Sequence, residues 1–287
     1  MKRNILTVFV FGLLVFGVFS CNKDPSLDIS DPDELIVIDG WIEKGQYAKV
    51  LLTRNSPYFS SIDSSSMRSL VLTRAKVTVS DGEKSEILIL RKNENYFPPY
   101  IYEGNEIEGD TGKIYKVTAE YGGKSAWAYT TIPTAVALDT VFFELEPESD
   151  SLGSLFLNFK DPPETKNYYR IFTKRNTMDS RYYPTMIMAL DDIFFNGEEF
   201  GFSITRGPKS ILSSYGNEYF KLGDTVSVKF CTIDKVHYDF WSSFQDEAFN
   251  SGNPFASSLS IIKSNVEGDG LGVWGGYGVS YYNLIIK

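Results

Sequence analysis

Histidine and cysteine are scarce in this sequence, and their scarcity excludes several kinds of site. The 287 residues include one histidine, His237, and two cysteines, Cys21 and Cys231. A zinc site built from several histidines or cysteines would need more ligands than these residues supply. A Ser-His-acid triad would have to use His237, and no Gly-x-Ser-x-Gly motif is present to place its nucleophile. We therefore expect His237 to be a packing or surface residue, and we predict a non-enzymatic protein without a metal or cofactor.

Basic residues are too few and too dispersed for a nucleic-acid partner. Removal of an N-terminal leader that holds Lys2 and Arg3 leaves 26 of the 28 basic residues against 37 acidic ones, a formal net charge of −11. No run of bases is dense enough to reverse this sign locally. Nucleic acid is therefore excluded as a partner, and binding of the folded body to anionic lipid is disfavoured.

The most apolar run, from Ile5 to Phe19, is short for a membrane span. It covers about fifteen residues, whereas a spanning helix needs roughly twenty, so it suits the apolar region of a signal peptide. The residues before Cys21 resemble the lipobox of bacterial lipoproteins, in which signal peptidase cuts and the cysteine is lipidated. We therefore predict a signal peptide over residues 1–20 and a fatty-acyl (palmitate-type) anchor on Cys21. The predicted recognition residues are Val18, Phe19 and Ser20.

Residues 21–34 are predicted to form a lipidated, acidic tether. Long acyl chains hold a protein on a membrane because each buried methylene contributes roughly 0.8 kcal/mol. The Lys23-Asp24 pair resembles the export signal that sends lipoproteins of the Bacteroidota to the outer face of the outer membrane. We therefore expect a lipid-anchored protein of the outer membrane that faces the cell exterior, with periplasmic retention as the alternative.

Alternating apolar and polar residues predict an antiparallel β-sandwich of immunoglobulin-like size over residues 35–133. Residues 75–80 alternate and reach Asp81-Gly82, which predicts a hairpin with 87–90. Residues 115–121 and 125–132 flank Gly122-Gly123 and predict a second hairpin. The serine-rich stretch from Ser56 to Ser69 is expected to be a long loop.

A second β-rich domain with one helix is predicted over residues 134–287. Its expected strands include 141–143, 155–159, 168–173, 186–190, 200–204 and the stretch 226–231 that contains Cys231. Asp234 is a suitable N-cap, and apolar residues recur every four positions from Val236, so a helix is predicted near 235–250. The overall prediction is a mainly β protein.

The glycine- and aromatic-rich segment from Gly268 to Tyr282 is predicted to be a loop. Residues 270–275 match Gly-x-Gly-x-x-Gly, but more glycines follow where a dinucleotide fold needs a helix. Aromatic residues among glycines could form a surface that stacks on a sugar or peptide or docks a larger partner. The alternative is a loop folded back over the second sheet. The candidate binding residues are Phe255, Trp274, Tyr277 and Tyr281.

Carboxylates leave a hydrolase open as an alternative. A glycosidase pair is defined by the distance between its two carboxyl groups in space, and sequence spacing does not reveal it. Nothing in the sequence distinguishes two acids from the rest. Acidic stretches such as Glu103 to Asp110 lack the spacing of an EF-hand calcium loop, so solvated turns are the favoured interpretation.

Several motifs together resemble an uncharacterised lipoprotein family of the Bacteroidota, a domain of unknown function numbered 4249. The resemblance covers nearly the whole mature chain and rests on six stretches: 38–42, 50–60, 75–82, 167–170, 253–255 and the glycine-rich end. Genes of such proteins commonly lie beside TonB-dependent outer-membrane transporters. The resemblance therefore implies an accessory or ligand-capture lipoprotein of an uptake complex, with a β-barrel transporter as partner and a glycan or peptide as ligand. A structural adhesion module is a further alternative.

Overall fold

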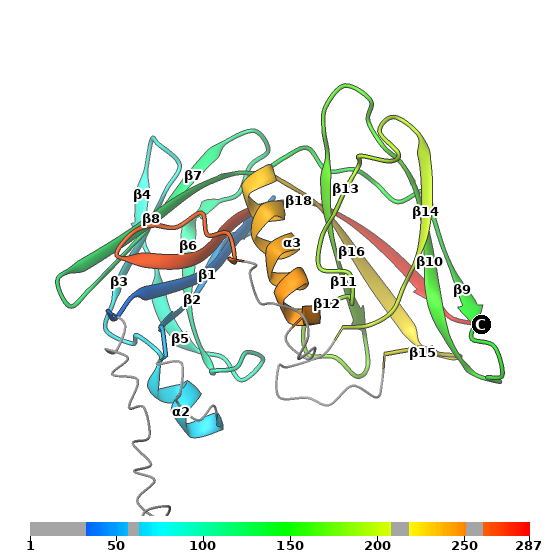
Figure 1. The fold of residues 1–287 in the computed structure, drawn as a ribbon, viewed down its shortest axis with the longest axis horizontal. Helices are drawn as coiled ribbons and strands as arrows, with labels where there is room; N and C mark the ends of the chain where they lie inside the picture. Colours follow the sequence, from blue (N-terminus) through cyan, green and yellow to red (C-terminus); the bar gives the residue numbers. More distant parts are fainter. Residues whose placement is uncertain (1–32, 57–62, 208–217, 251–260) are drawn as a thin grey trace, which may run out of the picture. The chain divides into compact units, whose positions relative to one another are not determined.

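A nine-stranded sheet runs through the body of the protein between Glu34 and Lys287, which is one compact unit (Figure 1). The structure is a computed structural model that describes residues 33–56, 63–207, 218–250 and 261–287. The predicted signal peptide, its recognition residues, Cys21 and nearly all of the predicted tether lie outside the described residues. Phe255 also lies outside them. The predictions for these positions therefore stay predictions.

The nine-stranded sheet, called here the central sheet, has the order β12-β11-β16-β18-β1-β2-β6-β5, with β13 paired to β11. Its strands are β1 (Ile36–Glu43), β2 (Tyr47–Arg54), β5 (Ile89–Lys92), β6 (Tyr100–Glu108), β11 (Tyr168–Arg175), β12 (Tyr183–Pro184), β13 (Leu190–Asp191), β16 (Thr225–Ile233) and β18 (Gly270–Ile285). Strand β18 joins the two halves of this sheet, because it pairs in parallel with β1 and antiparallel with β16.

Two smaller antiparallel sheets complete the β structure. The five-stranded sheet, in the order β17-β8-β7-β3-β4, contains β3 (Lys76–Ser80), β4 (Ser85–Ile87), β7 (Ile114–Tyr121), β8 (Lys124–Thr131) and β17 (Glu267–Gly268). The four-stranded sheet contains β9 (Thr140–Leu145), β10 (Leu152–Lys160), β14 (Glu199–Ile204) and β15 (Phe220–Lys221). The mainly β fold class with its sandwich-like packing is therefore confirmed.

Two hydrophobic cores lie on the same face of the central sheet. Successive side chains of a strand point to opposite faces, and the even-numbered residues of β1, among them Ile36 and Ile38, enter the first core together with Val77, Val117 and other residues of the five-stranded sheet. The even-numbered residues of β16, among them Phe230, enter the second core with residues of β10. The opposite face of the central sheet carries the odd-numbered residues of both strands.

Helix α3 (Lys235–Asn250) covers part of this opposite face, as predicted from the sequence. Asp234 caps it, because Oδ1 of Asp234 accepts a hydrogen bond from the backbone N–H of His237 at 2.9 Å. Figure 1 shows α3 along the middle of the body, where Tyr238 and Trp241 pack in a third core with Tyr168 and Tyr277. The helix thus encloses one end of the opposite face.

The second predicted hairpin is confirmed, because β7 pairs with β8. The first is confirmed in part: β3 pairs with β4 over residues 85–87, whereas residues 89 and 90 of the expected return strand belong to β5 in the central sheet.

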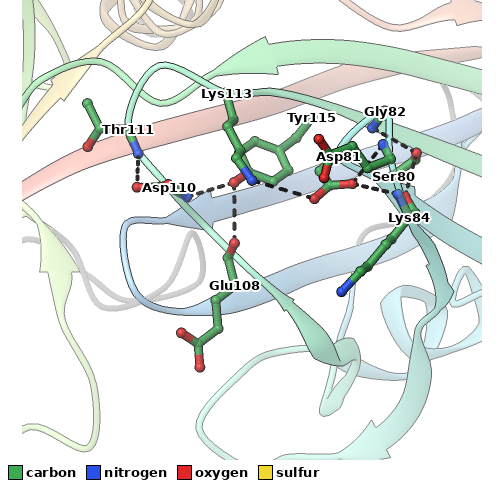
Figure 2. A network of polar contacts seen from close by, with 10 residues as sticks. Ser80, Asp81, Gly82, Lys84, Glu108, Asp110, Thr111, Lys113 and Tyr115 are labelled. Carbon is green, nitrogen blue, oxygen red and sulfur yellow. Dashed lines mark hydrogen bonds and ion pairs between the residues drawn. The ribbon is translucent and has the colours of Figure 1, made fainter.

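The turn between β3 and β4 is tightly hydrogen-bonded. The carboxylate of Asp81 accepts hydrogen bonds from the backbone N–H groups of Glu83 at 3.1 Å and Lys84 at 2.8 Å. The Lys113 ammonium lies 3.9 Å from the same carboxylate and links this turn to the connection between β6 and β7 (Figure 2). At that connection the hydroxyl of Tyr115 accepts a hydrogen bond from the backbone N–H of Asp110. These bonds hold the pKa of Asp81 below its usual value, chiefly through the Lys84 N–H.

Two predicted segments differ from the structure. The stretch from Ser56 to Ser69 is not a loop throughout, because α2 (Ser64–Ser69) forms behind the N-cap Asp63, which bonds the N–H groups of Ser65 and Ser66. The strand expected over 186–190 is reduced to β13, since much of that apolar segment is irregular chain whose residue Met188 bonds to α3 through the Gln245 side chain.

The predicted division into domains at residue 133 stays a prediction. The first core is formed mainly by residues before this position, and the second core by residues after it. Trp274 and Val266 nevertheless belong to the first core, and β18 pairs with strands from both parts. The last segment of the chain therefore contributes to both halves of the fold.

Candidate functional site

The face of the central sheet that points away from the two main cores carries a group of charged and aromatic side chains, called here the polar face. It is defined by Asp39, Trp41, Glu43, Arg170, Phe172, Lys229, Tyr277 and Tyr281. The strand registers place these residues on one side, because Glu43 pairs with Tyr277, Lys229 with Tyr281, and Phe172 with Lys229. The polar face is therefore continuous across four strands.

One end of the polar face is closed by a buried ion pair. The Lys229 ammonium contacts the Glu43 carboxylate, and the two side chains are only 7% and 12% exposed. The ammonium also lies over the rings of Phe172 at 5.1 Å and Tyr277 at 5.3 Å. Burial opposes the charge of Lys229, but its pKa is raised because Cys231 and Glu43 favour the protonated form more strongly. The charges of Glu43 and Lys229 thus neutralise each other.

Arg170 is a buried charge at the centre of the polar face. Its Nη1 donates to the hydroxyl of Tyr277 at 2.7 Å, and its Nε donates to the carbonyl of Met188 at 3.2 Å. The guanidinium carbon lies 3.4 Å from the ring centre of Trp241, which is a close cation–π contact. Arg170 is 4% exposed, and its Nη2 makes no hydrogen bond among the described residues.

His237 is buried in the same region and packs against the sheet. Its ring lies against Gly275, where an added Cβ would come within 2.1 Å of Nδ1, and its Nε2 is 3.4 Å from the hydroxyl of Tyr277. Burial, with the Arg170 charge as a second cause, lowers the pKa of His237 well below its usual value. The imidazole is therefore neutral at physiological pH.

Asp39 is the unusual residue of the polar face. Its side chain is exposed, and it makes no hydrogen bond or ion pair within the described part of the chain. Its pKa is nevertheless raised, because surrounding protein disfavours the charged form, and Arg170 and Arg181 oppose this effect only in part. We call Asp39 and the aromatic residues beside it, Trp41 and Tyr96, the Asp39 surface.

Trp41, Tyr96 and Arg181 form a row of contacts that begins beside Asp39. Trp41 follows Asp39 by two residues on the same side of β1, and its ring centre is 6.1 Å from that of Tyr96. The Arg181 guanidinium lies 4.9 Å from the Tyr96 ring centre and is positioned by a 2.8 Å hydrogen bond from its Nε to the carbonyl of Asn95. Arg181 Nη1 donates to the Tyr182 carbonyl at 3.4 Å. Its Nη2 has no partner within the described ranges.

The predicted loop from Gly268 to Tyr282 is a strand over most of its length, so this prediction is wrong. β18 begins at Gly270 and continues to Ile285. Its glycines allow close packing and do not form turns: a Cβ on Gly276 would lie 2.4 Å from the Thr131 carbonyl oxygen, and one on Gly278 would lie 2.1 Å from that of Pro133. The glycine-rich pattern therefore reflects other chain segments that cross directly against β18.

The predicted binding residues of this segment have different positions. Trp274 is fully buried in the first core, where its Nε1 donates to the carbonyl of Tyr115 at 3.0 Å. Tyr277 is 4% exposed and holds Arg170. Tyr281 is 54% exposed and lies on the polar face beside Lys229. Trp274 is therefore a core residue, Tyr277 is a buried residue that binds the Arg170 side chain, and Tyr281 is exposed to solvent.

Sequence reasoning did not identify Asp39, Trp41, Tyr96, Arg170 or Arg181 as site residues. A signal was present at the first two, since a charged residue and a tryptophan alternate with buried isoleucines along β1. The other three come from separate segments that only the tertiary structure brings together. No cluster of three or more metal-ligating side chains occurs among the described residues. Within the same part of the chain, neither helix has the length and apolarity of a membrane span.

Comparison with known proteins identifies a family. The model of the family described as "Domain of unknown function (DUF4249)" matches residues 23–282, and the chain belongs to this family. No curated protein matches the chain by sequence. Among solved structures, the chicken interferon gamma receptor alpha chain matches with 10% identity and a TM-score of 0.21, covering 69% of this chain and 88% of the receptor chain. A likeness this remote supports no conclusion about function.

Proposed function

For this member of the DUF4249 family, we propose a non-enzymatic role as a lipid-anchored ligand-capture protein of the outer membrane. Cys21 carries the anchor, the body faces the cell exterior, and the Asp39 surface receives the ligand. A TonB-dependent transporter is the partner to which the ligand passes. The observation that carries the binding role is Asp39 itself, an exposed carboxylate that makes no hydrogen bond or ion pair within the described residues and lies on the same side of β1 as Trp41, whose ring is 6.1 Å from that of Tyr96.

The Asp39 surface favours binding over hydrolysis. Two carboxyl groups that face each other across a substrate are the usual requirement for glycoside hydrolysis. Glu43 is the nearest other acid on the same face of β1, and Lys229 already engages it. Asp39 is therefore left as an acceptor of hydrogen bonds, not as one half of a catalytic pair.

The anchor and the location are tested in cells that make the protein. Metabolic labelling with a radioactive fatty acid should mark the natural chain and not Cys21→Ser. Protease added to intact cells should remove the body of the natural chain. A Cys21→Ser chain that stays in the outer-membrane fraction and is labelled equally would contradict the anchor, and protection from the protease would contradict surface display.

The partner is tested by purification from outer membranes solubilised in mild detergent. An affinity-tagged chain should recover a TonB-dependent β-barrel in constant proportion, and chemical cross-linking before solubilisation should increase the yield. Recovery of the lipoprotein alone under both conditions would contradict the transporter part of the proposal. This result would leave ligand binding at the Asp39 surface as a separate question.

A further inference from the structure

We infer that Arg170, His237 and Trp241 hold a small inorganic anion, of the size and charge of chloride, between α3 and the central sheet. Nδ1 of His237 and Nε1 of Trp241 are both buried, and neither has a hydrogen-bond partner among the described residues. Buried polar atoms in folded proteins nearly always have a partner, so two neighbouring nitrogens without one indicate a group that the polypeptide itself does not supply. This inference goes beyond the proposed function, because the site needs neither the lipid anchor nor a transporter.

The three side chains form one compact group. His237 and Trp241 are four residues apart on α3, which places them on the same side of the helix, and their ring centres are 6.4 Å apart. The Arg170 guanidinium carbon lies 3.4 Å from the ring centre of Trp241. Tyr277 joins the group from the sheet, because its hydroxyl accepts a 2.7 Å hydrogen bond from Nη1 of Arg170 and lies 3.4 Å from Nε2 of His237. Direct contacts therefore connect every member of the group to another.

All three side chains present N–H donors. The indole and guanidinium nitrogens can only donate. Because the Tyr277 oxygen already accepts from Arg170, its hydroxyl hydrogen is available to Nε2 of His237, and this order favours the neutral tautomer in which Nδ1 carries the proton. Nη2 of Arg170 also makes no hydrogen bond within the described ranges. The partner of these nitrogens must therefore be an acceptor.

The charge of the group favours an anion over a neutral acceptor. Arg170 is 4% exposed, and no carboxylate of the described part of the chain forms an ion pair with it. A buried charge without a counter-charge is costly, so one negative charge beside the guanidinium would be stabilising. The acid closest along α3, Asp234, is engaged on the other side of the helix start, where it accepts hydrogen bonds from the Thr130 hydroxyl at 2.8 Å and from the backbone N–H of His237 at 2.9 Å.

Burial limits the occupant to a small ion. His237 is 1% exposed and Tyr277 is 4% exposed, so a carboxylate or phosphate ester would have to bring the rest of its molecule into a packed region. A halide ion brings no further atoms. It is spherical, and it accepts hydrogen bonds from any direction. Chloride therefore fits both the enclosure and the set of donors.

The single histidine allows a direct test in solution. The probe is sodium chloride, which replaces sodium gluconate at constant ionic strength around the mature chain with Cys21→Ser, purified without a histidine tag. In a sample labelled with 15N-histidine and 15N-tryptophan, the ring nitrogens of His237 are the only imidazole signals, because the chain has one histidine. We expect the Nδ1 signal and one indole N–H signal to shift together and to saturate with chloride. The indole signal should be the one that Trp241→Phe removes.

Matched variants locate the ion. Trp241→Phe keeps an aromatic ring beside Arg170 and removes one donor, so it should weaken chloride binding at least about tenfold, because hydrogen bonds to a charged group are among the stronger ones. Trp127→Phe makes the same change on β8 and should bind chloride as the natural chain does. Thermal unfolding gives a second readout: chloride should raise the Tm of the natural chain relative to gluconate, and Trp241→Phe should lose most of this rise.

Crystals grown without halide and soaked in bromide provide a third readout. An anomalous peak within hydrogen-bond distance of Nδ1 of His237 and Nε1 of Trp241 is expected. If Trp241→Phe does not fold, this peak and the chloride titration of the natural chain decide the question.

Three results would overturn the inference. Signals of His237 that do not respond to chloride would assign the two nitrogens to a bound water molecule instead. Equal chloride responses in Trp241→Phe and Trp127→Phe would place the ion elsewhere, and bromide peaks confined to the surface would indicate an adventitious ion only. None of these results bears on the Cys21 anchor, surface display or the transporter, so the proposed function would survive them.

Discussion

Replacement of Trp274 by alanine should strongly destabilise the protein. Trp274 has no exposed surface, and its indole fills the first core against Gly40, where an added Cβ would lie 2.9 Å from its Cε3. Its Nε1 donates to the carbonyl of Tyr115 at 3.0 Å, which ties β18 to the five-stranded sheet. The substitution therefore removes both a large apolar volume and the donor for a buried carbonyl.

The size of the effect follows from these two losses. Truncation of a buried tryptophan to alanine costs about 3–5 kcal/mol. Loss of the donor to the Tyr115 carbonyl adds about 1 kcal/mol or more, because the buried acceptor is left unpaired. The total, about 4–6 kcal/mol, is a large part of the roughly 5–15 kcal/mol by which a typical domain is stable. At about 2–4 °C per kcal/mol, Tm should fall by at least about 8 °C.

Urea unfolding followed by circular dichroism measures this change on the mature chain with Cys21→Ser. Tyr281→Ala is the control, because Tyr281 lies on the same strand with 54% of its surface exposed, and it should cost about 1 kcal/mol or less. Trp274→Phe should lie between the two, since it keeps most of the volume and loses the N–H. A cost below about 1 kcal/mol for Trp274→Ala would refute the core position and restore the interpretation as an exposed aromatic loop.

Three further changes test other parts of the structure. Gly275→Ala should destabilise the protein by about 2 kcal/mol or more, because the new Cβ would overlap the His237 ring. In urea unfolding, the double variant with His237→Ala should recover part of this loss. If the costs of the two substitutions simply add, the contact between Gly275 and His237 is contradicted. Lys229→Ala should cost about 3–5 kcal/mol of stability, because it leaves Glu43 buried and unpaired. The double variant Lys229→Met with Glu43→Gln should cost clearly less, since it leaves no buried charge. Equal costs for the two variants would contradict a buried ion pair. Asp81→Asn should lower the stability at pH 7 and make the stability less dependent on acid pH. The reason is that folding lowers the pKa of Asp81, so its charged form stabilises the folded state. This stabilisation is complete above the unfolded pKa, near 3.8, and is lost as the pH falls through the lower folded pKa. An unchanged unfolding profile between pH 2 and pH 5 would contradict this role of Asp81.

Local patterns in the sequence predicted the elements whose cause is local. Alternation and the turn residues Asp81-Gly82 and Gly122-Gly123 are enough to specify the two hairpins, because strand faces and turn geometry depend on neighbouring residues. The Asp234 cap and the four-residue spacing after it specified α3 in the same way. The short strands β12, β13 and β15 were beyond such reasoning, since two residues carry no periodic signal.

The prediction of a loop at the glycine-rich end was wrong for a physical reason. Glycine in a sequence indicates either a turn or a position where another group approaches the backbone closely, and the sequence does not distinguish these cases. In β18 the approaching groups are the His237 ring and the carbonyls of Thr131 and Pro133, which lie far away in the sequence. The strand was therefore predicted as a loop, and its buried residue Trp274 was predicted as a candidate binding residue.

The sequence by itself determined the class of this protein: a mainly β body with a capped helix near its C-terminal end. Only the tertiary structure decided which groups form a site. Trp41 follows Asp39 on β1, whereas Tyr96 and Arg181 come from later segments, yet the Tyr96 ring lies 6.1 Å from that of Trp41 and 4.9 Å from the Arg181 guanidinium. Alternation along β1 could place Asp39 on a face, but the parallel pairing of β18 with β1 determines which residues share that face. Pairing between distant strands is a cooperative result of packing, and a single sequence does not display it.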